Sequence, residues 1–358
     1  MLLTIDVGNT NTVLGVFDAD QVIEHWRIAT VPDRTADELA VVLHGLLASS
    51  EAFAEREIHG ISLCSTVPSV LHEMREMCKR YYGDLSTVIV EPGVKTGVPV
   101  RTDNPKEVGS DRIMNSLAAV YLYGGPAIVV DFGTSTNFDA VSARGEFVGG
   151  VLAPGIEISV DALSRRAAQL LKVELTRPPR VIGKNTVEAL QSGIIYGFAA
   201  QVEGIATRMA GELSPDDPDA VTIIATGGLA PLVIDEVSVI DAYEPWLTLI
   251  GLRLVYERNV GHTESFVSTG LAGKAPGKRR ERRRLLSRSG PRPRSKPSKP
   301  AQRAPSRRSQ GRRSSARRRG KSPRERYRGR RRRDRPAPGR CAVYALRSST
   351  GPRCSAEA

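Results

Sequence analysis

The sequence predicts an α/β protein of two like-folded halves that face each other, followed by a basic tail. Apolar β-forming runs alternate with turn signals through residues 1–259, which is enough for a sizeable core. One acidic strand-loop-strand pattern occurs twice within this stretch. The length of 358 residues allows about two domains of roughly 150 residues each and an additional segment.

The first copy of the pattern occupies residues 4–17, which read TIDVGNTNTVLGVF. Asp6 and a run of small polar residues lie between two apolar runs of β-forming residues. A plain hairpin needs only a two-residue turn such as Asn-Gly, so this loop carries more polar atoms than a turn requires.

The second copy occupies residues 127–141, which read AIVVDFGTSTNFDAV. Asp131 follows Asp6 by 125 positions, which is one domain length. In each copy the glycine permits a tight turn close to a ligand, and Asn or Thr side chains and backbone N–H groups offer donors to phosphate oxygens. A single loop of this kind is a common turn, but two at domain spacing favour phosphate binding.

Two aspartates would repel each other and an anion at short range. A cation between them converts this repulsion into a bridge, and hydrated Mg²⁺ or a monovalent cation could serve. The pair therefore predicts a phosphate-binding site that contains a cation.

A third glycine element occupies residues 222–231, TIIATGGLAP, where an apolar strand opens into Gly227 and Gly228. A surface without side chains admits a flat ring such as adenine, although a glycine pair that caps a helix or ends a strand fits equally well. The order of the three elements resembles the nucleotide site of the actin, sugar kinase and heat-shock ATPase superfamily. That resemblance implies two duplicated actin-like (ribonuclease H-like) domains that close on an ATP cleft.

A helical segment is predicted between the two copies. Asn104, Pro105 and Glu107 form a helix-start signature. Beyond Gly109, apolar residues recur at helical spacing on one face, namely Ile113, Leu117, Val120 and Tyr121.

Asp111 and Arg112 lie near the start of this helix and have two interpretations. In the structural one, the helix dipole favours the carboxylate and Arg112 is solvated. In the functional one, Asp111 is a base for a hydroxyl group and Arg112 is a clamp for an anionic substrate. Phosphoryl transfer needs such a carboxylate to orient the nucleophile.

A second helix start occurs at residues 184–188, where Asn185 and Glu188 have capping-box spacing. The apolar pattern continues to residue 205, with three glycines that would let another backbone approach closely: Gly193, Gly197 and Gly204. Polar residues interrupt the segment, which favours helix packing, including packing across a dimer, over a membrane role.

The charge changes sign at residue 260. Residues 260–358 carry 32 basic and 5 acidic side chains, whereas residues 1–259 carry 20 and 34. The tail combines few apolar residues with many Pro, Gly and Ser, which predicts disorder. It could be a nucleic-acid-binding arm, a solubilising extension, or the translation of a shifted frame or missed stop; its residues with GC-rich codons favour the last.

The remaining composition predicts a cytoplasmic protein. Cys64, Cys78, Cys341 and Cys354 form no CxxC pair, and the histidines form no HExxH pattern, which suits a reducing cytosol and disfavours zinc chemistry. Asp6 interrupts the N-terminal apolar run, so no targeting segment is predicted. No apolar stretch reaches the roughly 20 residues that span a bilayer.

Five motifs together resemble type III pantothenate kinase over residues 1–259: DVGNT at 6–10, GSDR at 109–112, DFGTST at 131–136, GGVLAPG at 149–155 and GKNT at 183–186. The resemblance implies ATP-dependent phosphorylation of pantothenate to 4′-phosphopantothenate, the first step of coenzyme A biosynthesis. It also implies a homodimer whose substrate pocket lies near the subunit interface.

The resemblance assigns roles residue by residue. The ATP phosphates would be lined by Asp6, Val7, Gly8, Asn9, Thr10, Asn11, Thr12 and Val13, with Thr134 as a second ATP contact. Pantothenate would be held by Gly109, Ser110, Asp111 and Arg112, with Thr186 from the partner subunit. Asp111 would accept the proton, and Asp131 would bind a monovalent cation, K⁺ or NH₄⁺, beside ATP with Mg²⁺.

Two departures from the family pattern concern fine substrate contacts. Thr102 stands where the family often has an aromatic residue, and Asn137 stands where Thr is usual. The predicted domains are residues 1–120, with the first phosphate loop and GSDR, residues 121–259, with the second loop and the Gly-Gly element, and residues 260–358.

Two alternative functions would use the same ATP-binding fold. One is an ATP-binding regulator that contacts nucleic acid through the basic tail, in a salt-dependent way. The other is phosphate hydrolysis, as in polyphosphate-cleaving relatives.

Overall fold

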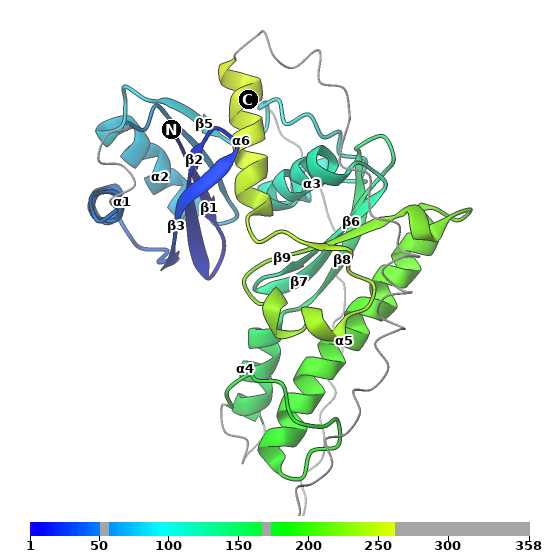
Figure 1. The fold of residues 1–358 in the computed structure, drawn as a ribbon. Helices are drawn as coiled ribbons and strands as arrows, with labels where there is room; N and C mark the ends of the chain where they lie inside the picture. Colours follow the sequence, from blue (N-terminus) through cyan, green and yellow to red (C-terminus); the bar gives the residue numbers. More distant parts are fainter. Residues whose placement is uncertain (51–56, 167–172, 262–358) are drawn as a thin grey trace, which may run out of the picture. The chain divides into compact units, whose positions relative to one another are not determined.

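The structure is a computed structural model that describes residues 1–50, 57–166 and 173–261 (Figure 1). Residues 262–358 lie outside the described part, so the disorder expected of the basic tail stays a prediction.

The first sheet has five strands in the order β3-β2-β1-β4-β5. β2 runs antiparallel to both β1 and β3, while β4 and β5 run parallel to β1. Two helices, α1 and α2, pack against one face of this sheet. The bounds are β1 (Leu2–Val7), β2 (Asn11–Asp18), β3 (Gln21–Ala29), α1 (Ala36–Ala48), β4 (Gly60–Ser65), α2 (Pro68–Tyr81) and β5 (Ser86–Ile89).

The second sheet repeats this arrangement, with the order β8-β7-β6-β9-β10. β7 runs antiparallel to both β6 and β8, while β9 and β10 run parallel to β6. The duplicated α/β fold predicted from the sequence is therefore confirmed. The bounds are β6 (Ala127–Phe132), β7 (Ser135–Val141), β8 (Phe147–Pro154), α4 (Ile156–Arg166), α5 (Thr186–Leu213), β9 (Thr222–Thr226) and β10 (Ala242–Tyr243), with short 3₁₀ turns at η3 (Pro218–Ala220), η4 (Ala230–Leu232) and η5 (Ile234–Glu236).

Strand alternation points Asp6 and Asp131 away from the outer helices, because successive side chains of a strand face opposite sides. In β1, Ile5 and Val7 pack with α1 and α2, so Asp6 faces the other way. In β6, the even-numbered residues, including Val130, pack with α5, and Asp131 lies on the opposite face.

Helices α3 (Ser110–Tyr123) and α6 (Leu247–Val260) each pack on the sheet of the other half. α3 follows the first sheet in the chain but contacts β6 and β7, while α6 follows the second sheet but contacts β1, β4 and β5 (Figure 1). The two helices also pack against each other. A methyl group on Gly251 would overlap the carbonyl oxygen of Met114, so the close crossing depends on this glycine.

Both helix starts behave largely as predicted. Residues Pro105–Glu107 form a single 3₁₀ turn, η2, and the α-helix begins at Ser110. Tyr121, predicted on the apolar face, is instead 50% exposed, and Met114 and Leu117 are buried.

The start of α5 is capped as its spacing predicted, because the Asn185 side chain accepts a hydrogen bond of 2.9 Å from the Glu188 N–H. No described backbone of this chain approaches Gly193 or Gly197, so the close approach at these glycines stays a prediction for packing across a dimer. A methyl group at either position would meet no described atom within 4 Å. The reason is that this side of α5 is exposed.

Cys64 in β4 and Cys78 in α2 are buried free cysteines. Among the described helices, none combines the length and the apolar character needed to cross a membrane.

Candidate active site

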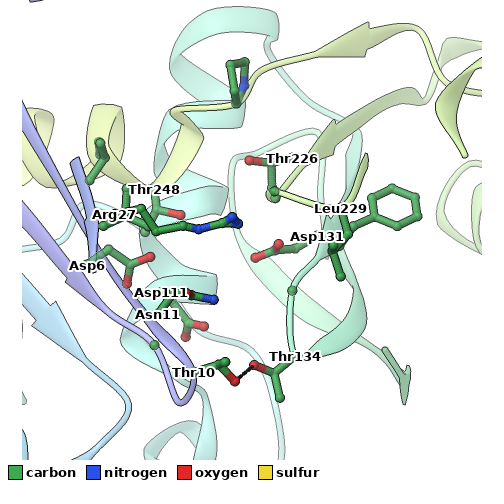
Figure 2. Close-up of a pocket in the computed structure, with 18 of the residues that line it drawn as sticks. Asp6, Thr10, Asn11, Arg27, Asp111, Asp131, Thr134, Thr226, Leu229 and Thr248 are labelled. Carbon is green, nitrogen blue, oxygen red and sulfur yellow. Dashed lines mark hydrogen bonds between the residues drawn. The ribbon is translucent and has the colours of Figure 1, made fainter. Parts of the chain in front are cut away.

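A cavity of about 530 Å³ brings together elements of both sheets (Figure 2). Its wall contains the two acidic loops and the Gly-Gly element. The residues that line it include Asp6, Gly8, Asn9, Thr10, Asn11, Val13, Arg27, Asp111, Asp131, Gly133, Thr134, Asn137, Glu157, Gly227, Gly228 and Thr248.

Each of the two loops contains a turn closed by a backbone hydrogen bond, and the two loops touch each other. The N–H of Gly8 donates to the carbonyl of Asn11 at 3.0 Å, and the N–H of Gly133 donates to that of Ser135 at 3.0 Å. Oγ1 of Thr10 lies 2.9 Å from Oγ1 of Thr134 (Figure 2). Both turns therefore present backbone N–H and hydroxyl groups to one cavity.

Thr30, just beyond β3, holds the first loop in place. Its hydroxyl donates to the carbonyl of Gly8 at 2.8 Å and its N–H donates to that of Thr10 at 3.0 Å. Thr12 contacts the same hydroxyl and is buried, and Val7 is buried in the core. Of the residues predicted to line the ATP phosphates, Val7 and Thr12 thus lie outside the cavity wall, as strand alternation requires.

Asp6, Asp111 and Asp131 share the cavity, and their surroundings disfavour full ionisation. Burial, then the charge of Asp111, raises the pKa of Asp6 to about 7, although the Cys64 thiol donates to Oδ1 of Asp6 at 3.3 Å and acts the other way. Burial, then the charge of Asp111, also raises the pKa of Asp131 to about 7. A cation or a proton in this cavity would relieve the repulsion.

Asn115 of α3 orients the Asp131 carboxylate. Its amide nitrogen donates to Oδ2 of Asp131 at 3.2 Å, and its amide oxygen accepts from the Thr248 hydroxyl at 2.7 Å. An ionised Asp131 carboxylate only accepts hydrogen bonds, so it requires the amide nitrogen to face it, and the Thr248 hydroxyl donates to the amide oxygen. Sequence reasoning missed both residues, because they lie on helices remote from the loop in the chain.

The donor set fits a cation that is shared with a ligand. Within the described residues there is no group of three or more His, Cys, Asp or Glu side chains that could hold a metal by itself. Mg²⁺ in nucleotide sites is commonly held by one or two carboxylates together with phosphate oxygens. Aspartates in one cavity, with Oδ1 of Asp111 buried and lacking a hydrogen-bond partner among the described residues, fit that mode.

Asp111 lies in the first turn of α3 with its carboxylate folded over Gly109. A methyl group on Gly109 would overlap Oδ1 of Asp111, so glycine is required for this placement. Burial raises the pKa of Asp111, while the N–H and the charge of Arg112 oppose the shift. A carboxylate of this kind is suited to accept a proton.

Arg112 is not solvated, so that half of the structural interpretation is wrong. Its Nε donates to Oδ1 of Asp139 at 2.7 Å, its Nη2 lies 2.6 Å from the same oxygen, and its guanidinium lies 5.1 Å from the centre of the Phe147 ring. Asp139 is fully buried, and burial raises its pKa to about 7 despite Arg112.

Asp139 lies in the second copy of the repeat, but sequence reasoning assigned it no role. Its counterpart in the first copy, 125 positions earlier, is Leu14. An acidic residue in one copy of the repeat, at the position where the other copy has a core leucine, is the sequence signal that could have identified Asp139.

The other predicted substrate residues do not line this cavity. The Ser110 hydroxyl donates to the carbonyl of Ser65 at 3.4 Å, and Gly109 lies beneath Asp111. Thr186 is exposed at the first residue of α5. The departure Asn137 does line the cavity, and its side chain accepts from the Ser135 hydroxyl at 2.7 Å.

The Gly-Gly element completes the wall opposite the first loop. Gly227 has a φ of +90°, and a methyl group there would lie 2.6 Å from Oδ1 of Asp131, so both its conformation and its surroundings require glycine. Arg27 of β3, which sequence reasoning missed, reaches across to Gly228.

The family model described as type III pantothenate kinase matches residues 2–208. Curated relatives of that name are 70% identical over 266 residues in Streptomyces avermitilis, 69% over 263 in Streptomyces coelicolor and 64% over 259 in Thermobifida fusca. These matches cover 72–74% of this chain and 99–100% of each relative. The chain belongs to the type III pantothenate kinase family.

Proposed function

We infer that the protein is a pantothenate kinase, which transfers the γ-phosphoryl group of ATP to pantothenate in the first step of coenzyme A biosynthesis. Membership of the family supports this activity. The observation in the structure that carries it is the meeting of the two phosphate loops at Thr10 and Thr134, on a cavity that also contains Asp111.

ATP brings about four negative charges toward several aspartates, so cations are required. Asp6 and Asp131 would hold them, with Mg²⁺ neutralising phosphate charge and a monovalent cation, K⁺ or NH₄⁺, at Asp131. The N–H groups and hydroxyls of the loops around Gly8 and Gly133 would bind the phosphate oxygens.

Asp111 would accept the proton of the pantothenate hydroxyl as its oxygen forms the bond to the γ-phosphorus and ADP leaves. Its raised pKa and its unpartnered Oδ1 support this role. Arg112, fixed by Asp139, would bind the pantothenate carboxylate, with Gly109 and Ser110 shaping the pocket.

The proposed homodimer is supported by exposed surface on the second half. Small residues follow one side of α5, and several large apolar side chains nearby are exposed. These are Leu152, Ile158, Leu163, Val181, Ile182 and Val187. A partner subunit on this surface would cover them and could bring its own Thr186 to the substrate.

The proposed compartment is the cytoplasm. Its reducing conditions suit the free cysteines Cys64 and Cys78.

A coupled assay of ADP release, with and without pantothenate, tests the function. ADP release should depend on pantothenate and should be faster in potassium than in sodium buffer. ADP release at the same rate without pantothenate would support phosphate hydrolysis instead. ATP binding without turnover under any condition would support the regulator.

A further inference from the structure

We propose that Arg27 of β3 binds the phosphate chain of the nucleotide. This rests on the proposed function, and it adds a cationic ligand that the roles assigned to the acidic loops do not include. Because β3 belongs to the first half and Gly228 to the second, one side chain would connect both halves to the same ligand.

The strand pairing explains why Arg27 faces the cavity. Arg27 pairs with Val13 of β2 in antiparallel register, and paired residues point to the same face. Val13 lines the cavity, and so does Arg27. Figure 2 shows the Arg27 side chain extending across the cavity toward Asp131 and Leu229.

Arg27 is the only Lys or Arg among the described residues that line this cavity, where it accompanies four acidic side chains. A wall of aspartates cannot by itself attract a polyphosphate. Arg27 therefore supplies the protein's own positive charge, in addition to any cation that arrives with the nucleotide.

The guanidinium of Arg27 has no partner within the part of the chain that the structure describes. Across residues 1–50, 57–166 and 173–261, no hydrogen bond or ion pair joins the Arg27 side chain to another residue. Arg112, by contrast, is paired with the buried Asp139. The donors of Arg27 are therefore free for a ligand, and their planar fork matches two phosphate oxygens.

The position of the guanidinium agrees with this role. A methyl group built on Gly228 would lie 2.5 Å from Nη2 and 3.0 Å from Nη1 of Arg27, so the guanidinium lies directly over this glycine. Three residues further along the chain, Thr30 anchors the carbonyls of Gly8 and Thr10. The segment that carries Arg27 thus also holds the first phosphate loop.

The test compares the binding of Mg-ATP, Mg-ADP and adenosine to the full-length chain by calorimetry. Loss of a charge-assisted contact should weaken ATP binding to Arg27→Ala by about 10- to 100-fold. ADP binding should also weaken, whereas adenosine binding should stay within about twofold. Arg27→Lys should be intermediate, because it keeps the charge without the fork.

The matched control is Arg80→Ala, which removes the α2 partner of a surface ion pair with Asp37 of α1, outside the cavity. It should bind all three ligands as the wild type does. Equal losses for adenosine and ATP in Arg27→Ala would place the guanidinium on the base and overturn the proposal, as would unchanged ATP binding. A wild-type chain that fails to bind ATP would overturn the proposed function itself.

Discussion

Oγ1 of Thr10 and Oγ1 of Thr134 lie 2.9 Å apart, although 124 positions separate them in the chain. This contact joins the two copies of the loop. Each hydroxyl therefore helps to place the other, and we expect the two to act together on the nucleotide.

A double-mutant cycle should detect this coupling. Thr10→Val and Thr134→Val should each weaken Mg-ATP binding, and the double variant should lose less than the sum, with a coupling energy of about 0.5–1.5 kcal/mol. Titration calorimetry of the four proteins measures it. Strictly additive losses would contradict the prediction, and Thr87→Val on β5 serves as the control.

Replacing the proposed base should separate binding from chemistry. Asp111→Asn should bind Mg-ATP at least as tightly as the wild type, because a like charge is removed, while phosphoryl transfer falls by about 100-fold or more. Rapid-quench measurement of product formation checks this. Asp103→Asn, an exposed change in the preceding segment, is the control. Wild-type turnover in Asp111→Asn would remove this residue from its role.

The raised pKa of Asp131 predicts how stability depends on pH. Its pKa is about 7 in the folded chain, above the ordinary value of the unfolded chain. Between these values the folded state keeps a proton that the unfolded state has released. The free energy of unfolding therefore falls as pH rises toward 7 and levels off above it.

Asp131→Asn removes that penalty, so its stability relative to the wild type should grow between about pH 5 and pH 8. Calorimetric melting without nucleotide, Mg²⁺ or K⁺ measures it, and 1 kcal/mol corresponds to about 2–4 °C in Tm. The exposed change Asp216→Asn should show no such trend. A constant difference across this pH range would refute the expectation.

Asp139 should act on the acceptor substrate through Arg112. Asp139→Asn keeps the shape of the side chain but weakens the ion pair, so KM for pantothenate should rise about 5- to 10-fold while KM for ATP changes little. Steady-state kinetics with each substrate varied gives the comparison. Glu146→Gln, in the exposed pair with Arg101, should leave both constants unchanged. An equal rise in both KM values would indicate a general structural defect instead.

The crossing of α3 and α6 should tolerate no added atom at Gly251. A methyl group there overlaps the Met114 carbonyl, so Gly251→Ala should cost about 1–3 kcal/mol in the free energy of unfolding. Gly45→Ala in α1, where nothing lies within 4 Å, should instead stabilise the chain by up to about 1 kcal/mol. Urea unfolding of both variants decides. A Gly251→Ala chain as stable as the wild type would be inconsistent with this packing.

Much of the fold could be predicted because its signals are local. The repeated strand-loop-strand pattern led to the duplicated sheets, and the cap at Asn185 lies where its spacing predicted. The family prediction, made from five short motifs, is confirmed by the family match and the relatives.

The partners of the site residues could not be predicted in the same way. Asn115 and Thr248 act through contacts between elements that are distant in the chain, and no local pattern marks them. What covers the face of α5 could not be predicted for a related reason. Spacing shows that small residues form a stripe, but it does not show whether this chain or another covers it.

The exchange of α3 and α6 between the two sheets affects how the two halves of the chain fold together. The last helix of each half covers the sheet of the other half, so each half alone would leave apolar surface of its sheet uncovered. A polypeptide severed after Gly124 would yield two fragments whose uncovered apolar surfaces are complementary, and the pieces should recombine without a covalent link. The two halves thus form one folding unit and are not two independent domains joined by a linker.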